Sequence, residues 1–233
     1  MNVLILGCSF GVPNYFGPPM PGPDTHTEFL LRKHGHTVFN CAKNGGSNLD
    51  SLERAKSFLH GIPITHPAFK DQSVKTTAGQ KIDWIVWFHT ELYRDLQKLP
   101  NKTNLFTQDR SAIAKLTYQS YKEFQDQTSA KLAVIGGAGE LDDCFSDYLL
   151  PEFTIRSWRS EILGIDTLSS HTLWQREYFN HSKDTVKEKL QRLENDLYLL
   201  DLTHASADFP DDYHPGERPH RELAEKLHKL FQL

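Results

Sequence analysis

The chain has 233 residues, of which 38% are hydrophobic, 24% are charged and 11% are aromatic. This length suffices for one α/β core, and the composition is that of a globular protein, which excludes wholesale disorder. The formal net charge of −4 is mild and supplies no basic stripe. We therefore expect neither a nucleic acid nor an anionic membrane surface as a partner.

The apolar amino-terminal stretch and the cysteines bear on the cellular compartment. The stretch has no basic flank and is only as long as one short strand, so it predicts neither a secretory signal nor a membrane span. Cys8, Cys41 and Cys144 are an odd number of cysteines at spacings unlike a zinc motif, and we expect them to be free and buried. Because free thiols suit a reducing compartment, we expect a cytoplasmic protein.

Apolar runs and helical patterns alternate along the first part of the chain. Nearly continuous apolar runs predict strands at 2–6, 37–41, 84–88 and 131–135. Helices are predicted at 27–33, at 47–59 with Ser47 or Asn48 as the cap, and at 111–126. Strands that are apolar on both faces are typical of a parallel sheet covered by helices. The chain therefore predicts a three-layer α/β/α fold with a central parallel sheet.

The second part of the chain predicts a helix at 184–193, a strand at 197–202 and a final amphipathic helix with Pro219 in its first turn. We expect a single domain over 1–233, with loop or lid insertions near 61–79 and 156–182. The second insertion carries aromatic residues that can either line a cleft or form the core of a lid: Trp158, Trp174, Tyr178 and Phe179.

Ser9 is the first candidate functional residue, because residues 7–11 read Gly-Cys-Ser-Phe-Gly and directly follow the first predicted strand. In an open α/β sheet, ligands bind at the carboxyl ends of the strands, where a hydroxyl between small residues can lie beside backbone amides. The five residues also fit the nucleophile elbow of the α/β-hydrolases. That fold has several strands before its serine, whereas only one precedes Ser9, so the motif needs another interpretation.

A second polar cluster lies just before the final helix. Asp211 and His214 are three residues apart, a spacing that lets the carboxylate accept the Nδ1 proton of the imidazole and turn Nε2 toward a nucleophile. Asp212 is the alternative carboxylate for this role. An acidic lead-in to a helix, with Asp211 or Asp212 as a cap, is an equally typical interpretation of the cluster alone.

Together, the two clusters resemble the SGNH (GDSL-type) hydrolase superfamily, in which a serine just after the first strand pairs with an Asp-x-x-His motif near the carboxyl terminus. The resemblance covers the layout of nearly the whole chain but only short motifs in identity, and Cys8 replaces the usual aspartate. It implies an SGNH-like, flavodoxin-like fold and an ester hydrolase with Ser9, Asp211 and His214 as its catalytic triad. We expect no cofactor and no metal.

The resemblance also implies an oxyanion hole, to which the amide of Ser9 contributes. Residues 40–48 follow the second strand and look like the second block of the family, with Gly45 as the first choice of amide donor and Gly46 as the second. The other interpretation of these glycines is an ordinary turn that leads into a helix cap.

The third block departs from the family. The pattern requires Gly-x-Asn-Asp after the third strand, whereas residues 88–91 read Phe-His-Thr-Glu. Thr90, or alternatively His89, is the candidate that can donate a hydrogen bond in place of the asparagine. Because losing one such donor typically costs about a hundredfold to a thousandfold in rate, the departure bears on efficiency more than on mechanism.

These residues predict a serine esterase that acts on a short-chain acyl ester, such as an acetyl group on a carbohydrate, with a small-molecule or glycan ester as its substrate. The alternative is a weakened SGNH-like scaffold that binds a glycan or a protein partner, which the altered third block and Cys8 favour. A Ser9→Ala variant would distinguish the two, because only a catalyst would lose turnover.

Two further kinds of site are weaker interpretations. A metal site can be assembled from carboxylates and imidazoles near the carboxyl terminus, namely Asp211, Asp212, His214 and either His204 or His220. Residues 136–139, Gly-Gly-Ala-Gly, follow a strand and can open a phosphate site, but they match neither dinucleotide nor P-loop patterns. A plain turn is the favoured interpretation of these glycines.

Overall fold

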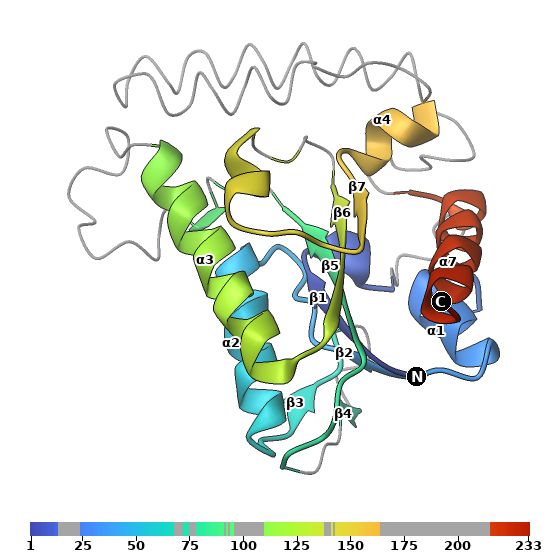
Figure 1. Cartoon of the computed structure of the whole chain (residues 1–233). Helices are drawn as coiled ribbons and strands as arrows, with labels where there is room; N and C mark the ends of the chain where they lie inside the picture. Colours follow the sequence, from blue (N-terminus) through green and yellow to red (C-terminus); the bar gives the residue numbers. More distant parts are fainter. Residues whose placement is uncertain are drawn as a thin grey trace.

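A five-stranded parallel sheet lies at the centre of the molecule, with helices on both faces (Figure 1). The computed structural model describes part of the chain, namely residues 1–13, 24–67, 72–74, 78–90, 92, 94–95, 110–137, 141, 143–163 and 215–233. The predicted α/β/α architecture with a central parallel sheet is therefore confirmed.

The strands of the sheet lie in the order β2-β1-β5-β6-β7, and all neighbouring pairs are parallel. Their bounds are Asn2–Gly7 for β1, Thr37–Asn40 for β2, Trp84–His89 for β5, Lys131–Gly136 for β6 and Phe153–Ile155 for β7. Two short strands, β3 (Ile64–Thr65) and β4 (Ser73–Val74), form a separate antiparallel pair. This order puts the end of β1 between the loops that follow β2 and β5.

Helices cover both faces of the sheet. Helices α2 (Asn48–Leu59) and α3 (Arg110–Thr128) pack on one face, while α1 (Thr27–Lys33) and α7 (Glu217–Phe231) lie on the other (Figure 1). The short helix α4 (Trp158–Leu163) adds to the second face. Two 3₁₀ turns, Ser9–Gly11 and Asp143–Asp147, follow β1 and precede β7.

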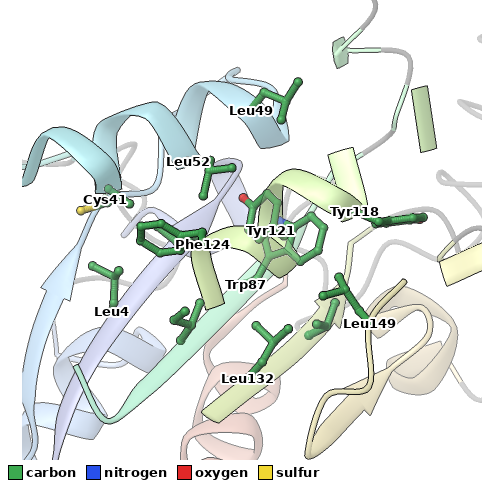
Figure 2. Packing of buried hydrophobic residues seen from close by; sticks show 14 of the residues in the cluster. Leu4, Cys41, Leu49, Leu52, Trp87, Tyr118, Tyr121, Phe124, Leu132 and Leu149 are labelled. Carbon is green, nitrogen blue, oxygen red and sulfur yellow. The ribbon is translucent and has the colours of Figure 1, made fainter. Parts of the chain in front are cut away.

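Large aromatic side chains fill the core between the sheet and helices α2 and α3 (Figure 2). All six residues of β5 are buried, which explains why its sequence is a continuous apolar run. The rings of Trp87 and Tyr121 stack with centroids 3.5 Å apart. Burial of such rings removes a large apolar area from water, so this contact holds α3 on the sheet.

The predicted elements agree with the structure where the apolar pattern is long. The strands predicted at 2–6, 37–41, 84–88 and 131–135 and the helices at 27–33, 47–59 and 111–126 are present within two residues at each end. Ser47 is the cap of α2, in a capping box with Asp50, so the choice between Ser47 and Asn48 is resolved. The helix and strand predicted at 184–193 and 197–202 lie outside the described residues.

Other elements were not expected from the sequence. Strand β7 has only three residues and a partly exposed pattern, so it has no apolar run to detect. The insertion predicted near 61–79 contains β3 and β4.

Trp158, in the second predicted insertion, is buried against Phe10 and Phe88, which makes it a core residue. The remaining aromatic residues of the second insertion lie outside the described part of the chain.

None of the three cysteines forms a disulfide, as predicted, but their burial differs. Cys8 and Cys41 are buried, whereas Cys144 is half-buried, so the expectation of burial is wrong for Cys144. Desolvation raises the pKa of the Cys41 thiol far above its ordinary value, which leaves it protonated and unreactive. Among the described residues, no helix combines the length and the apolar composition required to cross a lipid bilayer.

Candidate active site

The turn that carries Ser9 begins where β1 ends. Gly7 has a φ of 117° and lies so close to β5 that a Cβ atom there would be 1.9 Å from the carbonyl oxygen of Phe88. The amide of Cys8 then donates to that carbonyl at 3.3 Å, and Gly11 closes the turn by donating to Cys8. Only glycine permits this approach, so Gly7 determines where the backbone of Ser9 lies.

The loop after β2 lies on the other side of the same strand end. The amide of Lys43 donates to the carbonyl of Gly7 at 2.9 Å, which brings the predicted second block beside β1. Gly45 has a φ of 64°, and a Cβ atom added there would meet nothing within 4 Å. At Gly46, the added atom would lie 2.8 Å from the Lys43 side chain. Gly45 therefore has open space around it, whereas Lys43 covers Gly46.

His89 and Thr90 lie at the end of β5, and each is only 3% exposed. The ring of His89 packs against Trp87 and Tyr118, with centroids 5.0 and 5.9 Å away. The backbone amide of Thr90 donates to the Asn48 side chain at 2.9 Å. Both residues thus belong to the packed end of the strand, next to the loop after β1.

Asn48 is a structural residue that the sequence identified only as a possible helix cap. Its Oδ1 atom accepts from Trp87 Nε1 and the Thr90 amide, and its Nδ2 atom donates to the Thr90 carbonyl and to Asp95. These four hydrogen bonds use the whole capacity of the amide, so Asn48 cannot also donate to a ligand. Burial raises the pKa of Asp95, which accepts from the start of α2.

The start of α7 is connected to the turn that carries Ser9 through a shared aromatic contact. His220, in the first turn of α7, has its Nδ1 atom 2.8 Å from Thr27 Oγ1 and its ring centroid 5.0 Å from that of Trp158. The Trp158 ring in turn lies 6.3 Å from the Phe10 ring. Asp211, Asp212, His214 and His204 lie outside the described residues. The first turn of α7, a few residues after His214, is thus connected to Phe10 through the Trp158 ring.

No three histidine, cysteine, aspartate or glutamate side chains are grouped to hold an ion within the described ranges, but most residues of the metal interpretation lie outside those ranges. His220 instead packs on His26, with ring centroids 4.2 Å apart. The glycines at the end of β6 also have a packing role. A Cβ atom at Gly136 would lie 1.9 Å from the Arg156 carbonyl oxygen, and one at Gly137 would lie 2.8 Å from that of His89.

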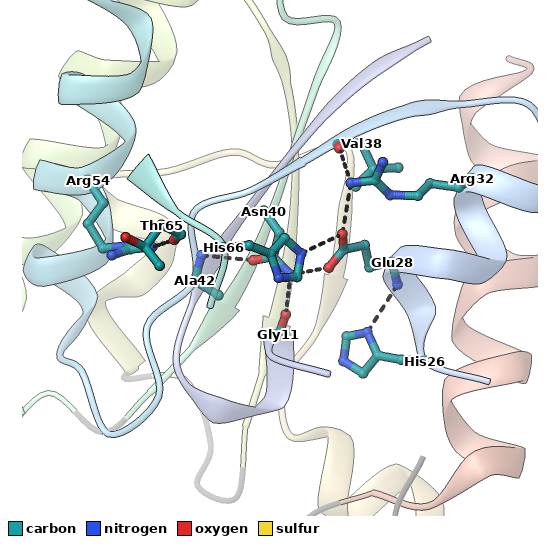
Figure 3. A network of polar contacts seen from close by, with 10 residues as sticks. All are labelled: Gly11, His26, Glu28, Arg32, Val38, Asn40, Ala42, Arg54, Thr65 and His66. Atoms are coloured by element: carbon teal, nitrogen blue, oxygen red, sulfur yellow. Dashed lines mark hydrogen bonds and ion pairs between the residues drawn. The ribbon is translucent and has the colours of Figure 1, made fainter. Parts of the chain in front are cut away.

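A fully buried carboxylate, Glu28, binds the Asn40 side chain, which also contacts Gly11 in the turn after β1 (Figure 3). Its Oε2 atom accepts from Asn40 Nδ2 at 2.7 Å, while Oε1 accepts from Arg32 at 2.9 Å and lies 3.0 Å from His66 Nε2. Burial alone would raise the pKa of Glu28, but the partners outweigh it, above all His66 and then Asn40 and Arg32. The net effect is a lowered pKa.

His26 connects this carboxylate's helix to the turn. Its Nδ1 atom accepts from the Glu28 amide at 3.2 Å as the cap of α1, so the ring proton lies on Nε2. That atom is 3.4 Å from the carbonyl oxygen of Phe10. Desolvation lowers the pKa of His26 to about 4, so the ring is neutral near pH 7.

Asn40 connects the carboxylate to two loops at the edge of the sheet. Its Nδ2 atom donates to the Gly11 carbonyl at 2.7 Å, as well as to Glu28, and its Oδ1 atom accepts from the Ala42 amide at 2.9 Å. Sequence patterns do not single out Asn40, because a polar residue at the end of a short strand normally reaches solvent. A charged residue in the first turn of α1 likewise predicts a solvent-exposed side chain.

Neither a family model nor a curated protein matches the chain. Among solved structures, one match is a carbohydrate esterase whose active site is described as displaying divergent catalytic and non-catalytic binding functions. The identity is 14% and the TM-score 0.47, over 99% of this chain and 64% of that chain. The present chain therefore spans less than two thirds of that protein.

A second match is a protein from Slackia heliotrinireducens that is described as a candidate SGNH hydrolase, the superfamily that the sequence motifs resemble. The identity is 13% and the TM-score 0.43, over 98% of this chain and 97% of that chain. Similarity at this level does not indicate a function.

Proposed function

We propose that the chain is an SGNH-type (GDSL-type) serine esterase that hydrolyses a short-chain acyl ester, such as an acetyl ester of a carbohydrate. The observation that carries the proposal is the position of the Ser9–Gly11 turn at the carboxyl end of β1. The loops after β2 and β5 flank it, with hydrogen bonds from Lys43 to Gly7 and from Cys8 to Phe88. Ligands bind at such edges of parallel sheets.

In the proposed mechanism, Ser9 Oγ attacks the acyl carbonyl while His214 Nε2 takes its proton, and Asp211 stabilises the resulting imidazolium. The ester bond then breaks, and the alcohol leaves with the proton that His214 returns. Water attacks the acyl-enzyme with His214 again acting as the base, which releases the acid and restores Ser9. Asp212 is the alternative partner of His214.

The amides of Ser9 and Gly45 are the proposed donors to the oxyanion. Gly45 is preferred to Gly46, because the Gly46 amide already donates to the Lys43 carbonyl at 3.0 Å. In the place of the family's asparagine we propose Thr90, with His89 as the alternative. Both lie at the end of β5, the strand paired with β1.

The start of α7 supports the proposed pairing of Ser9 with His214. Pro215 directly follows His214 and is buried, and His220 contacts the same tryptophan that packs on Phe10. We further propose that residues 1–233 form one domain, that a glycan or small-molecule ester is the substrate, and that the protein is cytoplasmic. The free thiols support the last point.

The Ser9→Ala variant tests the proposed function with an activated acetyl ester as the substrate. We expect turnover to fall by at least about a thousandfold while the thermal unfolding midpoint stays within a few degrees of the wild type. The Ser57→Ala variant, on α2, is the control and should keep full turnover. A fluorophosphonate should label the wild type at Ser9 and leave Ser9→Ala unlabelled.

Two results would contradict the proposal. Wild-type turnover in Ser9→Ala would show that Ser9 is not needed for the reaction. Labelling at another serine would show that this other serine is the nucleophile. A folded wild type that neither turns over esters nor reacts with the probe, yet binds glycans, would instead favour the non-catalytic scaffold.

A further inference from the structure

Both carbonyl groups of the turn that follows Ser9 accept hydrogen bonds from buried side chains of other elements. The Phe10 carbonyl lies 3.4 Å from His26 Nε2, at the start of α1, and the Gly11 carbonyl accepts from Asn40 Nδ2 at 2.7 Å, at the end of β2. His26 and Asn40 are both 0% exposed. The backbone of the turn is therefore held from two directions.

Glu28 joins these two contacts into one network (Figure 3). Its backbone amide donates to His26 Nδ1, and its carboxylate accepts from Asn40 Nδ2. Because the Glu28 amide can only donate, His26 Nδ1 must accept. The Ala42 amide likewise can only donate, so the atom of Asn40 that it contacts must be the acceptor Oδ1. The donors that face Phe10 and Gly11 are consequently determined by backbone groups, which cannot change their roles.

Asn40 also connects the two loops that carry the proposed oxyanion donors. One end of its side chain binds Gly11, two residues after Ser9, and the other binds Ala42, three residues before Gly45. A single rigid amide thus spans the turn after β1 and the loop after β2. Together with the hydrogen bond from the Lys43 amide to the Gly7 carbonyl, this side chain holds the two loops beside each other.

A buried carboxylate that joins a helix to a strand carries a large desolvation cost. Burial of an ionised group costs several kcal/mol before its partners compensate, and an apolar contact of the same size is often at least as stable. Its hydrogen bonds, however, hold their partners in one orientation. This property is more useful to a reaction site than to a core.

We propose that Asn40, Glu28 and His26 are positioning residues that hold the turn of Ser9 and the loop of Gly45 in the geometry needed for ester hydrolysis. This inference rests on the proposed function. Misplacement of a reacting group by about 1 Å can cost about a hundredfold in rate. Loss of the Asn40 donor should therefore lower kcat and leave KM almost unchanged, because none of these residues is proposed to bind the substrate.

The test exchanges the polarity of one hydrogen bond. Asn40→Asp keeps the acceptor for the Ala42 amide but removes the donor to both Gly11 and Glu28. Adding Glu28→Gln restores a donor between the two side chains, because an amide nitrogen at position 28 then faces the carboxylate at position 40. The acceptor toward Arg32 and His66 is retained. The double variant therefore regains the connection of α1 to β2 without regaining the donor to Gly11.

We expect Asn40→Asp to lose stability and to lower kcat by about tenfold to a hundredfold, with fluorophosphonate labelling of Ser9 slowed in parallel. The double variant should recover most of the stability while kcat stays low. Recovery of wild-type kcat in the double variant would overturn the proposal, because it would show that the residues only join the helix to the strand.

Asp83→Asn is the control, since it exchanges the same two side-chain types in the reverse direction at the amino ends of β1 and β5, far from the Ser9 turn, where Asp83 Oδ2 accepts from the Asn2 amide at 2.8 Å. It should lower stability without changing kcat. If Asn40→Asp does not fold, His26→Asn replaces it, because asparagine keeps the cap but cannot reach Phe10. Lowered kcat in that variant supports the proposal, and unchanged kcat overturns it.

The proposed function and this inference fail in different ways. If Ser9→Ala keeps its turnover, the proposed function is wrong, and positioning of Ser9 has no meaning. If Ser9→Ala is inactive and Asn40→Asp retains wild-type kcat, only the positioning role is wrong.

Discussion

At Gly7, the backbone of β1 approaches β5 more closely than any side chain would allow. Its φ of 117° lies in the region that L-residues avoid, and the carbonyl of Phe88 occupies the place of a Cβ atom. This one position sets the start of the turn that carries Ser9. A local motif of small residues around a serine thus has a physical cause in the packing of two strands.

We expect Gly7→Ala to lose at least about 4 kcal/mol of unfolding free energy or to fail to fold, because the added methyl group clashes with backbone that cannot move aside. Gly35→Ala is the matched control. Gly35 also has a positive φ, of 84°, but nothing lies within 4 Å of its added Cβ atom. Its loss should be only about 1–2 kcal/mol.

Urea unfolding of the two variants separates the clash from the conformational cost. Equal losses in both would mean that the β1–β5 contact relaxes around the methyl group. The approach at Gly7 would then not determine the position of Ser9.

Helix α2 is attached to the sheet through a polar contact at its first residue. Asn48 binds the side chain of Trp87 and both backbone groups of Thr90, while Asp95 accepts from Asn48 and from the Leu49 amide. The helix start, the end of β5 and the following segment are therefore held as one unit. The proposed third oxyanion donor lies within this unit.

We expect Asn48→Ala to lower the unfolding free energy by about 3 kcal/mol or more, because it removes a buried partner from several donors and acceptors at once. Asn2→Ala is the control, since the side-chain amide of Asn2 donates to the Lys81 carbonyl in an exposed position. That change should cost less than about 0.5 kcal/mol. Similar losses in both variants, measured by chemical unfolding, would contradict the role of Asn48.

Buried titratable groups make the stability of the whole molecule dependent on pH. Burial lowers the pKa of His26 to about 4 from its ordinary 6.5. Between these two values the unfolded chain binds a proton that the folded chain does not, so stability falls as the pH falls. The lowered pKa of Glu28 adds a second loss below its ordinary 4.5, as its carboxylate becomes protonated.

We expect the contribution of His26 to the unfolding free energy to be fully present above pH 6.5. Between pH 6.5 and about 4, the unfolding free energy should decrease by about 3 kcal/mol as this contribution is lost. His26→Asn keeps a cap acceptor but does not titrate, so its stability should vary less with pH in this window. Urea unfolding across a pH series measures both slopes. Identical slopes would show that His26 takes up its proton as readily in the folded chain as in the unfolded one.

The sequence predicts the α/β/α layers because the central strands are apolar on both faces, and this pattern depends on local composition alone. The helices at 27–33 and 47–59 follow from similar local signals, such as the Ser47 cap. Strand β7 escapes detection because its three residues have no such pattern. Its place is determined by pairing with β6.

The candidate site divides in the same way. Ser9 and Gly45 can be identified from the sequence because each lies just after a predicted strand, and parallel strands bring their carboxyl ends to one edge. Glu28 cannot be recognised, because an acidic residue in the first turn of a helix normally faces water. It is buried because His66, from the segment next to β3, and Asn40 reach it only in the folded chain.

Local patterns therefore determine which segments are strands and helices and which small or polar residues end them, since hydrophobic periodicity and caps act within a few residues. Contacts between distant segments decide the rest: the approach of Gly7 to Phe88, the amide of Asn40 between two loops, and the buried carboxylate of Glu28. These depend on burial and on hydrogen-bond geometry, which arise only when the sheet and its helices have assembled.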